Sequence, residues 1–199
     1  MLPMYGVWLP NDPRGTWCDV IWKWELLRYG QPRRGPERKA LMELTPEELR
    51  QREAAQQELQ YPPVTLTGLQ AQSIADGFAE TARKSNYTIW ACAILPQHVH
   101  LVLARHTYKV EQMANLLKGG ATKRIIHDGR HPLAQHASDN LYPRMWAEKR
   151  WKVYLDSDEQ IQNAIHYVDQ NPEEEGKPRQ HWAFVTPFGG LPGGHVTYH

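Results

Sequence analysis

The chain has 199 residues, of which 41% are hydrophobic, and a formal net charge of +1. This length suffices for one domain with a buried core, and the ordinary hydrophobic content argues against a disordered chain or a membrane protein. Cys18 and Cys92 have no CxxC spacing, which favours free thiols in a cytoplasmic protein over a disulfide. Residues 1–10 are too short for a membrane span and lack the basic leader of a signal peptide. We therefore expect a cytoplasmic protein without membrane contact.

The first third of the chain predicts a strand and an inserted arm. Tyr5–Leu9 is a short apolar run that ends at the turn-forming residues 10–15, as is typical of a strand. Residues 17–61 are expected to form an arm outside the compact core. Within this arm, Thr45 and Glu48 predict the capping box of a polar helix.

The middle of the chain predicts a helix followed by two paired strands. Apolar residues near helical spacing predict the helix over Gly68–Lys84. The almost unbroken apolar run Thr88–Leu95 predicts a buried strand. Pro96-Gln97 then predicts a turn, and His98–Ala104 predicts a second strand antiparallel to the first.

The next segments predict a helix and a further strand. Val110–His127 carries apolar residues at helical spacing, although Gly119-Gly120 weakens the helix. Met145–Leu155 predicts the strand, so the pattern continues to alternate helices with strands.

The last part of the chain predicts a helix and an irregular tail. The helix is expected over about Asp158–Gln170, and it should end at Asn171 because Pro172 disfavours helix at the preceding residue. From about residue 176 the sequence is rich in Gly and Pro and has no periodicity. The order of all these elements predicts an α+β fold, an antiparallel sheet with helices packed on one face.

Two histidines form a candidate metal site. His98 and His100 flank Val99 in a predicted strand, so both imidazoles point to one face and Val99 points to the other. Two imidazoles on one face can bind one metal ion and leave positions open for phosphate oxygens and water. Imidazole tolerates Mn²⁺ better than Mg²⁺. Considered alone, however, such a pair is more often two surface or half-buried histidines.

A tyrosine and an asparagine form a second candidate group. Tyr167 and Asn171 are four residues apart in a predicted helix and therefore share a face. Near a divalent cation a phenolate becomes accessible as a nucleophile, and an amide oxygen can serve as a metal ligand without adding charge. In most proteins such a tyrosine only packs in the core, and an asparagine before proline only ends the helix.

Basic and aromatic residues alternate in one stretch. Residues 105–155 contain ten Lys or Arg and four Asp or Glu. Tyr142, Trp146, Trp151 and Tyr154 lie among them, and cations beside aromatic rings suit a groove for single-stranded nucleic acid. A solvated basic face over ordinary core aromatics is the alternative. The residues we expect to contact DNA are Lys118, Lys123, Arg124, Arg144, Lys149, Arg150 and Lys152.

Two stretches of the chain resemble motifs of one protein family. Residues 95–103, Leu-Pro-Gln-His-Val-His-Leu-Val-Leu, are similar to the histidine-hydrophobic-histidine (HUH) motif of the IS200-like single-tyrosine transposases, whose usual string is Met-Pro-Asn-His-Val-His. Residues 167–172, Tyr-Val-Asp-Gln-Asn-Pro, resemble the tyrosine helix of that family. The resemblance covers roughly residues 63–177. The long arm and the opening Tyr-Gly-Val-Trp at residues 5–8 point to the branch of REP-associated tyrosine transposases.

The resemblance implies a single HUH transposase-like domain over residues 1–199, with a ferredoxin-like sheet and the catalytic tyrosine on a C-terminal helix. Tyr167 would attack a phosphodiester of single-stranded or hairpin DNA and leave a 5′-phosphotyrosine link and a free 3′ hydroxyl. His98 and His100 would bind Mg²⁺ or Mn²⁺, and Asn171 stands where the family places a polar ligand. The chain would act in DNA transposition or in a domesticated task, as a monomer or a homodimer.

Other functions are open at the level of sequence. The same fold could serve a catalytically idle protein that binds DNA hairpins, although such a protein has no need of His98, His100 and Tyr167 together. A replication initiator or relaxase also uses histidines and a tyrosine, but in a different motif order. A metal-binding protein unrelated to DNA is the last alternative, which the basic and aromatic stretch disfavours.

Overall fold

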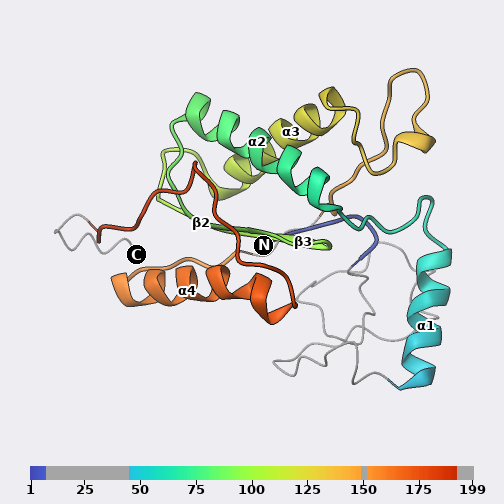
Figure 1. Cartoon of the computed structure of the whole chain (residues 1–199), viewed down its shortest axis with the longest axis horizontal. Helices are drawn as coiled ribbons and strands as arrows, with labels where there is room; N and C mark the ends of the chain where they lie inside the picture. Colours follow the sequence, from blue (N-terminus) through green and yellow to red (C-terminus); the bar gives the residue numbers. More distant parts are fainter. Residues whose placement is uncertain (8–44, 149–151, 192–199) are drawn as a thin grey trace.

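The computed structural model of the chain describes residues 1–7, 45–148 and 152–191. Three strands, four α-helices and a 3₁₀ turn make up the described part, and they confirm the α+β class (Figure 1). In chain order these elements are β1 (Leu2–Pro3), α1 (Pro46–Gln57), α2 (Gly68–Ser85), β2 (Ile89–Ile94), β3 (His98–Leu103), α3 (Val110–His127), η3 (Ala134–His136) and α4 (Asp158–Glu174). Within the described ranges, no helix has the length and apolar character needed to cross a membrane.

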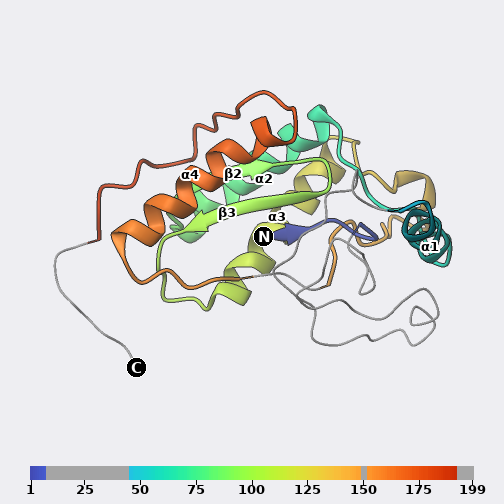
Figure 2. The same ribbon diagram turned by 90° about the horizontal axis from the view of Figure 1, so that it is seen from below.

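The sheet is antiparallel, with β3 in the middle. Its strand order is β1-β3-β2, and Figure 2 shows β3 between the other two strands. The predicted pair of strands is confirmed, and Ile94 lies opposite Val99 across the turn that joins them. The paired backbones hold the side chains of β3 in strict alternation, so one strand serves both faces of the sheet.

Helices cover both faces of this sheet. Val99 of β3 packs in the larger core with α2 and α3, whereas Val102 packs in a smaller core with Ile161 and Val168 of α4. Figure 1 accordingly shows α2 and α3 on one side of the sheet and α4 on the other. The prediction of helices on one face is therefore right for α2 and α3 and wrong for α4. Both faces of the sheet carry apolar side chains, so each face needs a cover.

Helices α2 and α3 cross at glycines. A Cβ atom added to Gly77 would lie 2.6 Å from the Cα atom of Ala121, and one added to Gly120 would lie 1.9 Å from Oγ1 of Thr81. The two backbones can approach this closely only because both positions lack a side chain. The glycine pair at 119–120 was predicted to weaken α3, yet the helix runs unbroken through it.

The end of α4 differs from the prediction. The helix passes through Pro172 and stops at Glu174, not at Asn171. Beyond it, Gly176 adopts a positive φ of 67°, its N–H donates to the carbonyl of Glu173, and the N–H of Lys177 donates to the carbonyl of Pro172. This hydrogen-bond pattern is a Schellman motif, in which a glycine in the left-handed region ends a helix. The glycine, not the proline, therefore fixes where α4 ends.

Two predicted strands are wrong where the structure describes them. The first strand is Leu2–Pro3 rather than Tyr5–Leu9, because the chain turns at Tyr5–Val7 with Gly6 at a φ of 71°. In Met145–Leu155 the described residues form no strand, and only an isolated bridge joins Trp146 to Met4. Residues 8–44, which hold the end of the first predicted strand and most of the predicted arm, lie outside the described residues, as do 149–151.

The helix predicted at the end of the arm is confirmed as α1. The side chain of Thr45 accepts a hydrogen bond from the Glu48 N–H, and the Glu48 carboxylate accepts one from the Thr45 N–H. These two bonds are the capping box that the sequence predicts. Among the residues of α1, Ala55 is the buried one, so the helix is as polar as expected.

The helix crossing yields a test of this packing. Gly77→Ala should lower the free energy of unfolding by about 1–3 kcal/mol, because the new methyl group meets the α3 backbone, which has no room to move. Gly119→Ala is the matched control. Its new methyl group would meet nothing within 4 Å, so it should raise stability by about 0.5–1 kcal/mol through the better helix propensity of alanine. Urea denaturation measures both, and equal effects would contradict the close crossing.

Candidate functional site

The two histidines of β3 lie side by side on the face that α4 covers. His98 and His100 are 7% and 9% exposed, their ring centroids are 4.8 Å apart, and the ring planes are nearly perpendicular. They share this face with Val102, as the alternation of a strand requires. The residue opposite His100 on β2 is Ala93, whose small side chain leaves room for an imidazole beneath a helix.

Helix α4 brings two of its side chains to these histidines. The ring of Tyr167 contacts that of His100 edge to face, with centroids 5.4 Å apart. Two turns further along, Oε1 of Glu175 lies 3.7 Å from Nε2 of His98. The C-terminal half of α4 and the capping residue that follows it therefore run along the histidine pair. Tyr167 is 38% exposed and therefore more accessible to solvent and to a ligand than either imidazole.

Asn171 lies between these two contact points. Residues 167, 171 and 175 follow one another at intervals of four, the spacing that aligns side chains on one helical face. Asn171 is 6% exposed, and its Oδ1 atom is buried without a hydrogen-bond partner among the described residues. A buried amide oxygen without a partner is costly unless a bound group satisfies it. By this spacing, Asn171 belongs to the helical face on which Tyr167 contacts His100.

These residues fit a divalent cation. Two imidazole nitrogens, one amide oxygen and one carboxylate are a mixed N/O donor set of the kind that Mn²⁺, Mg²⁺ and related cations accept. In the described ranges, no three His, Cys, Asp or Glu side chains are gathered as a metal site. A metal site at His98 and His100 therefore needs a third ligand, either the amide oxygen of Asn171 or the carboxylate of Glu175, which lies 3.7 Å from His98.

Glu175 is the residue that the sequence interpretation missed. The reason is that the helix was expected to end at Asn171. Residue 175 then fell in the irregular tail, where no helical face could be assigned to it. Because α4 runs on to Glu174, the helical spacing of four carries from Tyr167 through Asn171 to Glu175. Gly176 directly after Glu175 was the available signal, since glycine is the usual residue just beyond a helix end.

Lys118 is buried, unlike the other predicted DNA-binding residues that the structure describes. It is 9% exposed, and its ammonium group donates a hydrogen bond of 2.8 Å to the carbonyl of Ala147. The same group lies 5.9 Å from the ring centroid of Trp146, within the range of a cation–π interaction. Lys118 thus links α3 to the segment after η3.

Two of the predicted arginines are held by carboxylates. Arg124 pairs with Asp76 at 3.2 Å and with Asp128 at 3.0 Å, and the hydrogen bond to Asp128 raises the pKa of the arginine. Arg144 pairs with Glu148 at 2.9 Å on an exposed surface. Exposed pairs of this kind exchange readily with water, so they leave a guanidinium group able to contact a phosphate.

Of the remaining predicted cations, the structure describes Lys123 and Lys152. Lys123 is exposed on α3, whereas Lys152 hydrogen-bonds to Glu111, which raises the pKa of the lysine. Lys149 and Arg150 fall outside the described residues. As a DNA-contacting set, the seven residues stay a prediction.

A scan of the chain against protein-family models found no match, and a search of curated proteins found none either.

Lys118 can be tested as a structural residue. Lys118→Ala should lower the free energy of unfolding by about 1–3 kcal/mol, because it removes a charge-assisted hydrogen bond and leaves the Ala147 carbonyl without this donor. Lys123→Ala, one turn along the same helix but exposed, should change stability by less than about 0.5 kcal/mol. Both values come from chemical denaturation. If the two variants were equally stable, the ammonium group of Lys118 would have no structural role.

Proposed function

We propose that this chain cuts and rejoins single-stranded DNA, with Tyr167 as the nucleophile and a divalent cation bound by His98, His100 and Asn171. The observation that carries the proposal is the contact of the Tyr167 ring with His100 at 5.4 Å. The two candidate groups of the sequence, far apart along the chain, thus meet in one place. Both motifs resemble those of the HUH single-tyrosine transposases, REP-associated branch. That resemblance is the basis for proposing DNA cleavage by a tyrosine as the chemistry of this site.

The proposal includes a ferredoxin-like core. The central position of β3 in an antiparallel sheet and the paired helices α2 and α3 on one face are compatible with it. In that arrangement α4 is the tyrosine helix, and it covers the opposite face.

The residues have separate roles in the proposed reaction. A bound divalent cation would neutralise charge on the scissile phosphate and favour the phenolate of Tyr167. The Tyr167 oxygen forms a bond to phosphorus while the bond from phosphorus to the 3′ oxygen breaks. The tyrosine proton leaves to solvent, and the departing 3′ oxygen takes up a proton. The 5′ end then stays on Tyr167 until a 3′ hydroxyl reverses these steps, so no other energy source is needed.

The surroundings of Tyr167 suit a nucleophile that must reach a polymer. Its ring is 38% exposed, whereas the imidazoles beneath it are almost buried. The histidines are therefore held rigidly on a strand, as pre-organised ligands should be, and the tyrosine stands at the surface where a DNA strand can approach. Glu175, at 3.7 Å from His98, is placed to orient that imidazole or to add an oxygen ligand.

The test is the covalent adduct. Hairpin-bearing single-stranded oligonucleotides incubated with the full chain and Mn²⁺ or Mg²⁺ should give a protein–DNA adduct that survives denaturation. Tyr167→Phe should abolish it while keeping the ring that contacts His100. His98→Ala should reduce it by about 100-fold or more, because the loss of a ligand removes most of the charge stabilisation. Tyr108→Phe is the matched control, since Tyr108 is 42% exposed and its ring contacts Tyr87, away from the histidines.

Each failure has a distinct meaning. A broad oligonucleotide panel without any adduct would contradict the enzymatic proposal, and tight hairpin binding in that case would support an idle DNA-binding protein. An adduct that persists in Tyr167→Phe would place the nucleophile elsewhere. Full cleavage by His98→Ala in the presence of a chelator would remove the metal from the proposal.

A further inference from the structure

A second recess lies on the side of α4 that faces away from Tyr167. It is a cleft of about 630 Å³ between α4 and the C-terminal segment Arg179–Phe188, with Trp90 and Cys92 of β2 among its lining residues. Clefts of this size are typical of small-ligand sites. His166 and Asp169 line it from α4, and His166 directly precedes Tyr167 in the chain. The cleft and the candidate active site thus lie back to back across one helix.

A β-bulge turns Trp90 toward this cleft. Ile89 pairs with Leu103 and Ala91 pairs with Val102, so Trp90 is an extra residue in β2. The bulge changes the alternation of the strand: Ile89 packs in the larger core, whereas both Trp90 and Ala91 lie on the α4 side. Without it, Trp90 would face α2 and α3. Bulges re-aim side chains in this way beside functional sites.

The C-terminal segment is a fixed wall of the cleft. Near one end, the side-chain amide of Gln180 exchanges two hydrogen bonds of 2.8 Å with the backbone of Ile94. Near the other end, the Thr186 N–H donates to the carbonyl of Ile89. The segment therefore covers the outer edge of β2, which protects that edge from other strands.

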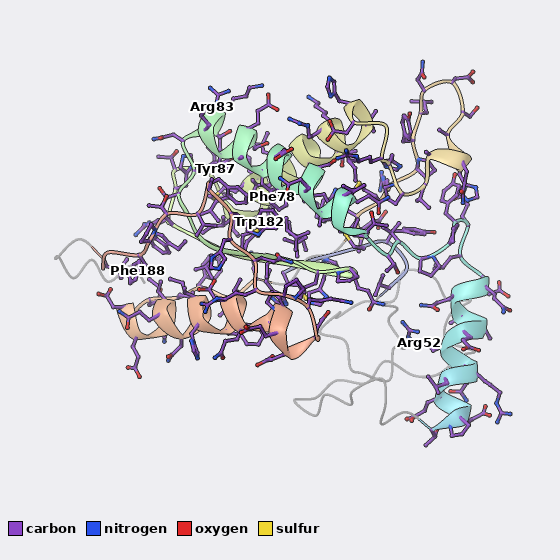
Figure 3. All side chains as sticks on the ribbon, viewed as in Figure 1. Arg52, Phe78, Arg83, Tyr87, Trp182 and Phe188 are labelled. Carbon is purple, nitrogen blue, oxygen red and sulfur yellow. The ribbon has the colours of Figure 1, made fainter. Side chains whose placement is uncertain are left out.

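Aromatic rings meet in the cleft. Phe188 contacts Trp90 edge to face with ring centroids 4.7 Å apart. Trp182 lies on the same wall, and Figure 3 shows Trp182 beside the sheet and Phe188 nearer the first turns of α4. Half-buried rings that remain accessible at a cleft are stacking platforms for flat ligands.

The polar groups at the cleft include a guanidinium that can bind a phosphate. Arg179 is 52% exposed and lies 3.8 Å from the carboxylate of Asp169, a distance too long for a hydrogen bond. The exposed imidazoles of His166 and His181 lie on the two walls. Because the Arg179–Asp169 distance is too long for a hydrogen bond, the guanidinium keeps its N–H donors for a phosphate oxygen, and the two imidazoles add polar contacts on either side.

We propose that this cleft binds one unpaired nucleotide of the DNA strand, with the base against Trp90 and Phe188 and a phosphate at Arg179. This inference rests on the proposed function, because it assigns the substrate strand of that reaction a second point of contact. This nucleotide is a different one from the nucleotide whose phosphate Tyr167 attacks. Aromatic rings beside a cation are the general means by which proteins bind single strands without reading sequence.

The experiment measures DNA binding without cleavage. A fluorescein-labelled ten-residue oligothymidine is titrated with the full chain in EDTA and followed by anisotropy. Arg179→Gln and Phe188→Leu should each weaken binding by about 5- to 10-fold, through loss of a phosphate contact and of stacking. Arg83→Gln is the matched control, because Arg83 is an exposed arginine at the end of α2 on the opposite face of the sheet (Figure 3), and it should bind like the wild type.

A cross-link locates the base directly. An oligothymidine that carries one 5-iododeoxyuridine, irradiated with the protein, should cross-link to Trp90 or to residues 182–188, as mass spectrometry of the peptides would reveal. Wild-type affinity in both cleft variants, or cross-links confined to other segments, would overturn the inference. So would equal weakening with a duplex probe, whose bases are not free to stack. If Phe188→Leu fails to fold, Arg179→Gln and the cross-link decide.

The two proposals can fail separately. If the cleft variants bind oligothymidine like the wild type while the Tyr167 adduct forms normally, the proposed reaction stands and only the nucleotide contact in the cleft is wrong. Cleft-dependent binding without any adduct would support a single-strand binding site and contradict the catalytic role of Tyr167.

Discussion

The alternation of side chains along β3 is the constraint on which the rest of the molecule depends. Because β3 is the central strand, its odd and even positions serve two different layers. Val99 faces α2 and α3 and anchors the larger core. His98 and His100 face α4. Apolar residues at these two positions would only pack against that helix, whereas the histidines bring polar nitrogen atoms to it. A shift of one residue in the pairing would bury the wrong set, so the register with β1 and β2 protects the site as well as the core.

Helix α4 brings polar groups to the two buried histidines. Almost buried imidazoles need polar partners, and Glu175 at the end of α4 brings its Oε1 atom to 3.7 Å from Nε2 of His98. The helix presents apolar Ile161 and Val168 to the sheet, whereas Tyr167 contacts His100 and Glu175 lies at His98. The same helix faces the cleft with its opposite side. We thus regard α4 as the element that couples the proposed reaction to the proposed strand contact.

Local signals in the sequence predicted much of this fold. The apolar runs gave β2 and β3, helical spacing gave α2 and α3, and the shared face of His98 and His100 followed from alternation alone. Long-range effects could not be predicted from these local signals. The side of the sheet that α4 covers is set by packing, and the bulge at Trp90 depends on the pairing of β2 with β3. Glu175 was missed because Pro172 suggested an early helix end, whereas the hydrogen bonds around Gly176 place it later.

The most direct test of the metal site is a titration of the full chain with Mn²⁺, followed by NMR of the side-chain signals. Paramagnetic broadening falls steeply with distance, so the account predicts that the imidazole signals of His98 and His100 and the side-chain amide of Asn171 disappear first, below one equivalent. His166 and His181, on the other side of α4, should broaden less at that point. First broadening at His166 or His181, or none at His98 and His100 with excess Mn²⁺, would contradict the account.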